Sequence, residues 1–476
     1  MRYRYLAVCF AMLAAGATAQ GQAGAERFER QLEQIRREMR LMARPEVPPG
    51  QRALVDYGAF LSFNLYAVDD VLQDTHILRR TEAVAYARLN MDNVHEFYIR
   101  GRGTYDDYNS GDSFDGKGDE ADGVVELCFY RFDLGRALAA YRGQTTPNNL
   151  VVQLGRQFVH WGNGLVLSDT LDGGMVELTA GPLRLELLGG VSWRHMIDFD
   201  ASRPGFEDNT ERGFYGGMLS AQVGAHRPFA YVLVQRDYND EGPQMIGAAP
   251  TRFSYDSWYA GIGAEGSFGN HVVYGVEFAW EGGRGLSSSF DPATLAVTDQ
   301  TREDIEAAAL DVRLDYLFGD ARRSRLSLET VLASGDDDRL HTSNTFGGNR
   351  SGTKDHAFNA FGLINTSFAF APNVSNLTAV RLGASTFPFG DTSGFLRQMQ
   401  VGIDLFIFGK FNTDGGFTEP TTDDWYLGWE PDVYMNWQIT SDIALALRYG
   451  VFFPGSAIVN DEHPRNFFFA GITFSF

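Results

Sequence analysis

The chain has 476 residues, and its 40 basic residues are outnumbered by 61 acidic ones, which gives a formal net charge of −21. A surface this negative argues against nucleic acid as a partner, because phosphates are held by Lys and Arg. The two cysteines lie at positions 9 and 128, so a mature chain that has lost a short leader would hold no internal disulfide.

Residues 1–19 have the composition of a secretory signal peptide. Arg2 and Arg4 form a basic start, a short apolar run follows, and the small residues Ala17–Ala19 precede the expected cleavage. The apolar run is short for a membrane-spanning helix, and no later stretch holds eighteen uninterrupted apolar residues. We therefore expect an exported protein that has no membrane-spanning helix.

Residues 20–50 differ from the rest of the chain, because they are rich in charged residues that favour helix. Their apolar residues recur at steps of three and four and form one stripe of Phe28, Leu32, Ile35, Met39 and Met42. We expect a periplasmic amphipathic helix here, followed by a Pro-rich linker from Pro45 to Gly50. The helix either lies against the rim of the next domain or mediates oligomerisation.

From residue 51 onward the apolar residues repeat with a period of two, which is typical of β-strands. Between Leu310 and Phe318, for example, apolar side chains alternate with Asp311, Arg313 and Asp315. The strands are long enough to cross a membrane at a tilt, and short turns alternate with long polar loops. Aromatic residues gather near strand ends, as in the girdles of membrane barrels. The pattern predicts an all-β protein, an antiparallel transmembrane β-barrel over residues 51–476.

The turns predict eighteen strands, with sixteen as the alternative. An even number places both chain ends on the periplasmic side, as export through a signal peptide requires. One predicted strand covers 355–370 and is followed by a short turn at Ala371–Asn376. Residues 391–424 are predicted to form a long loop, in which Val401–Phe408 is either an extra strand or a segment folded into the lumen. The turn within 134–149 is not defined by the pattern.

The last predicted strand ends on an aromatic residue. Its apolar side chains alternate with Gly471, Thr473 and Ser475, and they are Phe468, Ala470, Ile472, Phe474 and Phe476. This ending resembles the signal that the outer-membrane assembly machinery reads, so we expect this strand to close the barrel.

Two segments resemble the alginate-export family of outer-membrane barrels. The first holds Leu154-Gly155-Arg156-Gln157, then Trp161–Gly164, then Thr170–Gly173, where Leu171 replaces the Phe of the family's Phe-Asp-Gly element. The second holds Leu427–Asp432 and Tyr449–Gly455, and it is similar to the family's closing hairpin with its Phe-Pro-Gly. A weaker likeness involves Ala333–Asp336, Thr345, Phe346 and His356.

The resemblance implies an outer-membrane channel of a Gram-negative-type bacterium that passes an anionic polysaccharide or oligosaccharide. The expected partners are outer-membrane lipid, the anionic polysaccharide and periplasmic secretion components. No cofactor and no metal ion is implied. A general or cation-preferring diffusion porin is the alternative function.

The polar faces of the predicted strands supply candidates for a lumen, where Arg can grip carboxylates with its planar fork. The facing of Arg156 is ambiguous, and the basic candidates are Arg88, Arg100, Arg102, Arg156, Arg184, Arg194, Arg313, Arg325, Arg381 and Arg448. The opposing acidic candidates are Glu82, Glu96, Glu186, Glu277, Asp311, Asp315, Glu329 and Asp432, and the same face carries Glu126, Glu281 and Glu430. So many acids indicate that charges pair, that an Arg face opposes an acid face, or that a few Arg form a local ladder for carboxylates.

Two loop features suggest other chemistry. The acidic loops, among them Asp336–Asp338, are rich in oxygen and could hold Ca²⁺, but they lack a defined ligand spacing and are expected to be solvated. His341 and Ser343 have the spacing of an esterase dyad, in which His takes the Ser proton. Their polar, Gly-rich surroundings indicate a mobile loop, whereas a dyad needs rigid positions. We therefore expect a channel and not an enzyme, with a membrane-embedded hydrolase as the least favoured reading.

Overall fold

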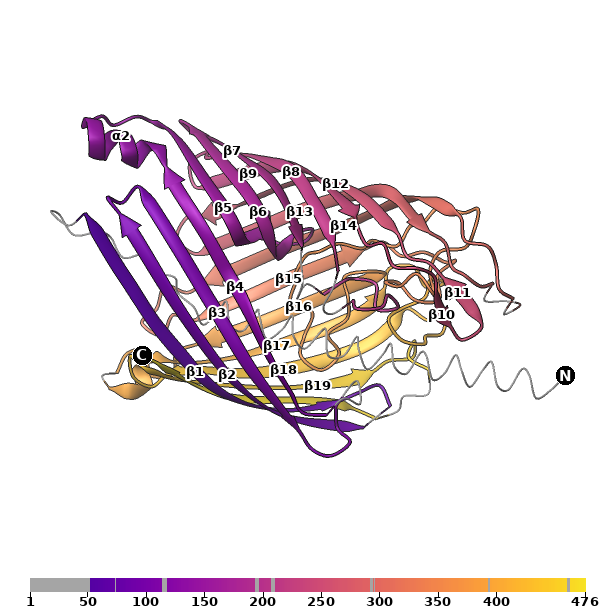
Figure 1. Cartoon of the computed structure of the whole chain (residues 1–476). Helices are drawn as coiled ribbons and strands as arrows, with labels where there is room; N and C mark the ends of the chain where they lie inside the picture. Colours follow the sequence, from indigo (N-terminus) through magenta and orange to yellow (C-terminus); the bar gives the residue numbers. More distant parts are fainter. Residues whose placement is uncertain are drawn as a thin grey trace.

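The computed structural model describes residues 52–476, except 73, 114–117, 193–196, 207–209, 292–293, 295, 393 and 460–462. Eighteen antiparallel strands form one closed sheet (Figure 1). The strands are β1 Ala53–Asp69, β2 Thr75–Met91, β3 His95–Tyr108, β4 Glu120–Asp133, β5 Asn148–His160, β6 Ser168–Ala180, β7 Leu183–Ser192, β8 Arg212–Ala221, β9 His226–Asp237, β12 Tyr255–Phe268, β13 Val272–Leu286, β14 Arg302–Leu317, β15 Arg325–Ala333, β16 Leu377–Thr386, β17 Met399–Lys410, β18 Tyr426–Gln438, β19 Ile443–Pro454 and β20 Arg465–Ser475.

Each of these strands pairs with the next one along the chain, because short connections favour antiparallel neighbours. The wall closes where β1 meets β20, with Phe60–Val68 in register with Phe467–Ser475. Two further short strands, β10 Gln244–Ile246 and β11 Ala249–Thr251, form a separate hairpin in the connection from β9 to β12. Eighteen strands were predicted from the turns, and that number is confirmed.

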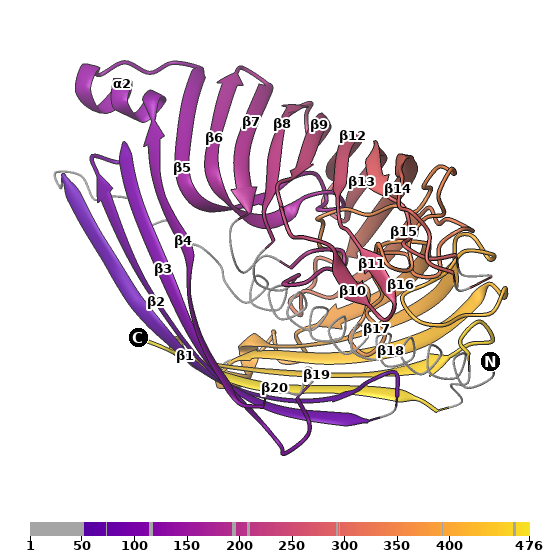
Figure 2. The same cartoon turned by 45° about the vertical axis from the view of Figure 1, so that its right-hand side comes forward.

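The two ends of the barrel differ, and we name them by their connections. At the short-turn end, β2 and β3 are joined by Asp92–Val94, and β6 and β7 by Gly181 and Pro182. At the long-loop end, the connection from β15 to β16 alone covers 334–376. Figure 2 shows that the long connections lie on the side of the barrel where β10 and β11 are found.

The exposure of the side chains is reversed relative to a water-soluble sheet. On β3 the apolar Phe97 and Ile99 are 43% and 48% exposed, whereas Glu96 and Arg100 are buried on the inner face. The same alternation of apolar outer and charged inner residues follows most of the wall, as a barrel in lipid requires. Among the described residues no helix combines the length and hydropathy needed to cross a membrane.

Two expectations about single elements were wrong. Residues 355–370 form no strand, since they belong to the irregular connection from β15 to β16, and Ala371–Asn376 is not a strand turn. In their place Met399–Lys410 forms β17, which confirms the extra-strand reading of Val401–Phe408. Because one predicted strand is absent and one additional strand is present, the number of strands remains eighteen. The long loop expected at 391–424 is therefore divided, with β17 reached through the short 3-10 helix η1 at Phe395–Gln398.

The undefined region 134–149 contains a short helix, α2 Leu134–Arg142. The Asp133 side chain accepts a hydrogen bond from the amide of Arg136 and so caps its first turn. Gly143 ends the helix in the left-handed conformation, with φ of 64°. The predicted signal peptide and amphipathic helix fall within 1–51, outside the described residues.

The junction of β4 with β5 is an irregular part of the wall. The two strands are in register only from Cys128 to Asp133 on β4, and Figure 2 shows them separating beyond that stretch. Gly155 adopts a φ of +120°, and a Cβ there would lie 2.2 Å from the Cys128 carbonyl oxygen. On the other side of β4 the register with β3 shifts between Arg100 and Gly101. Gly155 therefore permits the close approach from which β5 bends away.

Gly155→Ala should destabilise the barrel at this junction. The new methyl group meets the Cys128 carbonyl in a backbone conformation that L-residues avoid, so we expect a loss of about 1–3 kcal/mol. The measurement is the urea unfolding midpoint of the barrel in detergent micelles. Gly123→Ala on β4 is the matched control, because its Cβ would have no neighbour within 4 Å. Equal midpoints for the two variants would contradict this account of the junction.

Candidate transport lumen

The connection 334–376, which we call the inward segment, is held to the wall by the carboxylate of Glu430. This residue lies on β18 and is fully buried. Its oxygens accept hydrogen bonds from the amides of Phe368, Ala369 and Phe370 at 2.9, 2.5 and 2.8 Å, and from Ser367 Oγ at 2.9 Å. A carboxylate offers about four acceptor positions. One wall side chain therefore satisfies the backbone donors of a whole turn of irregular chain.

Two acids on β13 act in the same way. Glu281 accepts from the amide of Asn359 at 2.8 Å and from the Tyr255 hydroxyl at 2.7 Å. Glu277 accepts from the amide of Asn163 at 2.6 Å, and Asn163 belongs to the connection between β5 and β6. That connection also touches the inward segment through the parallel bridge of Leu167 with Phe361. Irregular backbone inside a barrel needs such partners, because a buried amide without one is costly.

These contacts change what the acidic candidates do. Glu277 lies on the wall among the predicted opposing acids, but its oxygens are taken by loop amides and the Tyr231 hydroxyl, and its side chain is fully buried. Asp311 is likewise buried, and its Oδ2 accepts from Asn163 Nδ2 at 2.9 Å. Neither carboxylate faces the space through which a solute would move.

Three adjacent strands carry a row of alternating charge that does face such a space. Arg313 on β14, Glu329 on β15 and Arg381 on β16 are direct cross-strand partners. The guanidinium of Arg313 lies 2.7 Å and that of Arg381 2.6 Å from the two oxygens of Glu329. One carboxylate thus serves two guanidiniums, and we call these three residues the arginine row. Register between neighbouring strands produces it, since opposed residues of a sheet lie side by side.

The arginine row lines a cavity of about 490 Å³ in the lumen. Its charged lining residues are three arginines and two glutamates, namely Arg313, Arg325, Arg381, Glu265 and Glu329. Arg325 lies at the short-turn end of β15, 2.8 Å from Asp315. Its side chain is 42% exposed, and it contributes to the lining of the cavity. Glu265 is held 2.7 Å from Arg227. The lining therefore offers guanidinium donors to an anion.

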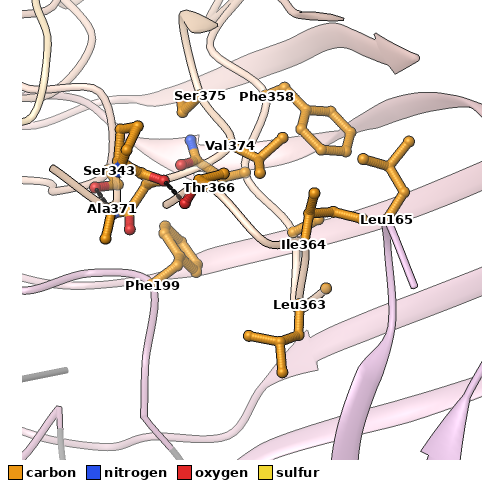
Figure 3. Close-up of a pocket in the computed structure, with 15 residues that line it drawn as sticks. Leu165, Phe199, Ser343, Phe358, Leu363, Ile364, Thr366, Ala371, Val374 and Ser375 are labelled. Carbon is orange, nitrogen blue, oxygen red and sulfur yellow. Dashed lines mark hydrogen bonds between the residues drawn. The ribbon is translucent and has the colours of Figure 1, made fainter. Parts of the chain in front are cut away.

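A smaller cavity of about 60 Å³ is lined mostly by residues of the inward segment (Figure 3). Leu363 lines both cavities. The smaller cavity is bounded largely by apolar side chains, with Leu165 and Ile364 close to Leu363 and Phe199 entering from the connection between β7 and β8. The lumen is thus narrowed by apolar side chains immediately next to the charged cavity.

Ser343 also borders the smaller cavity, and its contacts bear on the esterase dyad that the sequence suggests but does not favour. Ser343 Oγ accepts a hydrogen bond from Asn373 Nδ2 at 3.0 Å. His341 Nδ1 accepts a hydrogen bond from the backbone amide of Ser343 at 3.3 Å. This contact does not involve the Ser343 hydroxyl. The contact between the two residues is therefore that of a turn. It does not have the geometry of a base that takes a hydroxyl proton.

A second group of paired charges lies on β2, β3 and β4. Glu126 is the extra residue of the register shift, and its oxygens lie 2.6 Å from Arg100 Nε and 3.3 Å from Arg102 Nε. A bulge re-aims a side chain, and here it directs one carboxylate between two guanidiniums. Arg88 lies 3.2 Å from Glu96. As in the arginine row, one acid serves two arginines.

The remaining candidates have varied surroundings. Arg184 is paired with Glu186 at 3.0 Å and with Glu177 at 2.8 Å, and Arg156 lies 4.0 Å from Asp172. Arg448 donates to backbone carbonyls and to Asn436. Glu82 and Asp432 are buried, and Asp432 is in register with Asp404. Arg194 lies outside the described residues.

At the long-loop end, a buried charge network fixes the connection between β7 and β8. Arg203 lies 3.0 Å from Asp198 and 2.7 Å from Asp237. Burial alone would lower the pKa of Arg203, but the surrounding carboxylates raise it above its usual range. Burial, with the charge of Asp198, raises the pKa of Asp200, which accepts from Thr345 Oγ1 at 2.6 Å. This end of the lumen is therefore tied to the inward segment as well.

The acidic run Asp336–Asp338 brings three carboxylates close together. Asp336 is buried, and its two oxygens each accept a backbone amide at 2.7 Å, one from Asp338 and one from His356. These bonds give Asp336 a structural part in the start of the inward segment.

Comparison with known proteins identifies the family of the chain. The sequence profile described as Alginate export matches residues 69–469. The chain belongs to the alginate export family. No curated protein sequence matches the chain.

Solved structures show the same fold. OccAB3 of Acinetobacter baumannii has a TM-score of 0.52 at 10% identity, covering 89% of this chain and 99% of that one. OpdO of Pseudomonas aeruginosa has a TM-score of 0.51 at 11% identity, covering 89% and 97%. OpdK of Pseudomonas aeruginosa, solved with vanillate, has a TM-score of 0.50 at 10% identity, covering 88% and 98%. Family and fold together identify an outer-membrane channel.

The sequence pattern did not predict that residues 334–376 leave the wall and form the inward segment. A signal was present, because residues 357–380 carry no charge, unlike the polar face of every wall strand discussed above. They are instead rich in Asn, Ser, Thr and Phe, which suit a chain that packs against others and bonds its own backbone. The anchors Glu281 and Glu430 were assigned to the inner face, but nothing in the sequence indicated their partners.

Glu430→Ala should release the inward segment from the wall of this family member. The amides of Phe368, Ala369 and Phe370 lose a buried charged acceptor, which is worth about 2 kcal/mol locally. We expect roughly thirtyfold faster hydrogen exchange at those amides, measured by mass spectrometry.

Glu306→Ala is the control for that experiment. Glu306 pairs with Lys354 of the same segment at 2.7 Å, but both side chains are exposed, so little stability is at stake. Unchanged exchange in Glu430→Ala, or an equal effect in Glu306→Ala, would show that the buried carboxylate does not hold the segment.

Proposed function

We propose that this channel passes an anionic polysaccharide or oligosaccharide across the outer membrane, and that the arginine row, together with Arg325 of the same cavity, binds its carboxylates. The observation that carries the proposal is the cavity of about 490 Å³ in which Arg313, Arg325 and Arg381 converge. In this proposal the barrel wall contacts outer-membrane lipid, and periplasmic secretion components deliver the polymer.

The chemistry of the arginine row suits a polymer that must bind and also leave. Glu329 accepts two hydrogen bonds from Arg313 and forms an ion pair with Arg381, so each guanidinium keeps further N–H donors for an incoming carboxylate. A uronate that approaches exchanges places with part of an internal ion pair instead of filling an empty, strongly basic site. Transport needs such moderate and repeated binding along the path.

The alternative, a general or cation-preferring diffusion porin, has its own supporting observation. Most lumen arginines outside the arginine row have acidic partners, as in the pair of Arg88 with Glu96 and that of Arg184 with Glu186. A wall of balanced charge would conduct small ions of either sign. OpdK, which shares the fold, was solved with vanillate, a small carboxylate, so a barrel of this shape also holds monomeric anions.

Arg325→Gln should weaken uronate binding without disturbing the fold. Arg325 is the most exposed arginine of the cavity lining, and glutamine keeps an amide N–H donor for the buried partner Asp315. Removing a charge-assisted hydrogen bond should raise the dissociation constant for tetrameric uronate about tenfold or more, measured by calorimetry in detergent. Arg284→Gln is the control, since Arg284 is exposed and pairs with Asp304 outside the cavity.

Reversal potentials in planar bilayers separate the two functions. Anion preference that falls in Arg325→Gln and persists in Arg284→Gln supports the uronate channel. Cation preference in the unmodified barrel, together with no measurable uronate binding, would favour the diffusion porin.

A further inference from the structure

Four aromatic rings form a continuous row across the first four strands. Phe60 on β1, Tyr86 on β2, Tyr98 on β3 and Phe129 on β4 follow one another, and we call them the aromatic row. Their successive centroids are 6.0, 6.2 and 5.4 Å apart, and successive ring planes differ by 24°, 26° and 32°. The four strands lie side by side in both views of the barrel (Figures 1 and 2).

The aromatic row lies on the inner face of the wall. Tyr98 shares the face of Glu96 and Arg100, whereas Phe97 and Ile99 face outward. Tyr86 is partly buried, and the residues on either side of it, Ala85 and Ala87, are exposed outward. These rings therefore stand among the charges of the lumen and not in the lipid-facing girdle.

A glycine on β1 makes room for the second ring. Gly58 is the cross-strand partner of Tyr86, and a Cβ on Gly58 would be 2.9 Å from Cε1 of the Tyr86 ring. With no side chain at Gly58, the ring of Tyr86 has room to approach the backbone of β1 at this point.

Guanidiniums accompany the rings. The guanidinium carbon of Arg88 lies 5.3 Å from the centroid of Tyr98, and Arg88 also pairs with Glu96. Arg100 and Arg102, on the same strand as Tyr98, share Glu126. The inner surface of β1–β4 thus combines a strip of aromatic rings with hydrogen-bond donors beside it. A pyranose ring needs both, because its C–H faces pack on aromatic rings while its carboxylate and hydroxyl groups seek polar partners.

We propose that the aromatic row is a saccharide-binding track, on which the pyranose rings of the transported polymer pack face to face. This inference rests on the proposed function and adds a second contact surface to the arginine row. Cross-strand aromatic pairs also stabilise sheets, but that role needs no run of four rings on a charged face, nor a glycine that makes room for one of the rings.

The test compares ring-flattening variants in the full-length barrel. Tyr86→Leu and Tyr98→Leu keep apolar area on the wall but remove the flat aromatic faces. Phe97→Leu is the matched control, since Phe97 is on β3 but faces outward, where it packs 4.8 Å from Tyr130. The probes are tetrameric uronate and a neutral cello-oligosaccharide of the same length, measured by calorimetry in detergent micelles.

We expect each inner variant to weaken binding of both oligosaccharides by about threefold to tenfold, which corresponds to the usual strength of one aromatic contact. The control should bind as the unmodified barrel does, and the unfolding midpoints of all variants should report whether the fold is intact. Loss of neutral oligosaccharide binding is decisive, because the arginine row contributes little to an uncharged ligand.

The outcomes separate this inference from the proposed function. If uronate binding depends on Arg325 but is the same in Tyr86→Leu, Tyr98→Leu and Phe97→Leu, the saccharide track is overturned and the uronate channel stands. If the neutral oligosaccharide binds through the two tyrosines while uronate shows no advantage, the track stands and the proposed charge selectivity fails. If the unmodified barrel binds neither oligosaccharide, both are overturned.

Discussion

The hydrogen bonds from the inward segment to the carboxylate of Glu430 set the shape of the lumen. A chain that leaves the wall and turns into a barrel carries its backbone amides with it, and inside a crowded lumen those amides find few partners. A buried carboxylate supplies several acceptor positions from one side chain, and its charge is stabilised by the same donors. Glu277 and Glu281 repeat the arrangement on β13, so the wall itself determines where the inward chain can lie.

The basic side chains of the lumen also depend on partners of opposite charge. A lone guanidinium in a confined space is costly, so nearly every arginine discussed above has an acid within reach. In the proposed function, selectivity depends on the places where one acid serves more than one arginine. Glu329 and Glu126 each serve two arginines, and each lies on the inner wall of a different part of the barrel. Guanidiniums therefore gather around each of these two acids, and the aromatic row lies beside Glu126.

Much of the wall was predictable, because a period of two in strands such as β13 and β14 is a local property of the sequence. The inner and outer faces followed from the same period. Residues 355–370 misled the prediction, since a largely apolar stretch satisfies the pattern of a strand equally well when it packs inside a barrel. The pairing of Arg313 and Arg381 with Glu329 depends on register between strands, and the anchoring of Phe368 by Glu430 joins residues about sixty positions apart. Neither is recorded in the local pattern of the chain.

The closure of the wall has a consequence for how this protein reaches its final state. Ser62 and Thr473 are hydrogen-bonded across the junction of β1 with β20, although 411 positions separate them along the chain. Contacts of such long range form slowly, because so much chain must first be ordered. Until they form, the sheet has two open edges that pair readily with other chains. The hazardous period in the life of this barrel is therefore its assembly, when the edges are exposed, and the finished wall has no edge left to protect.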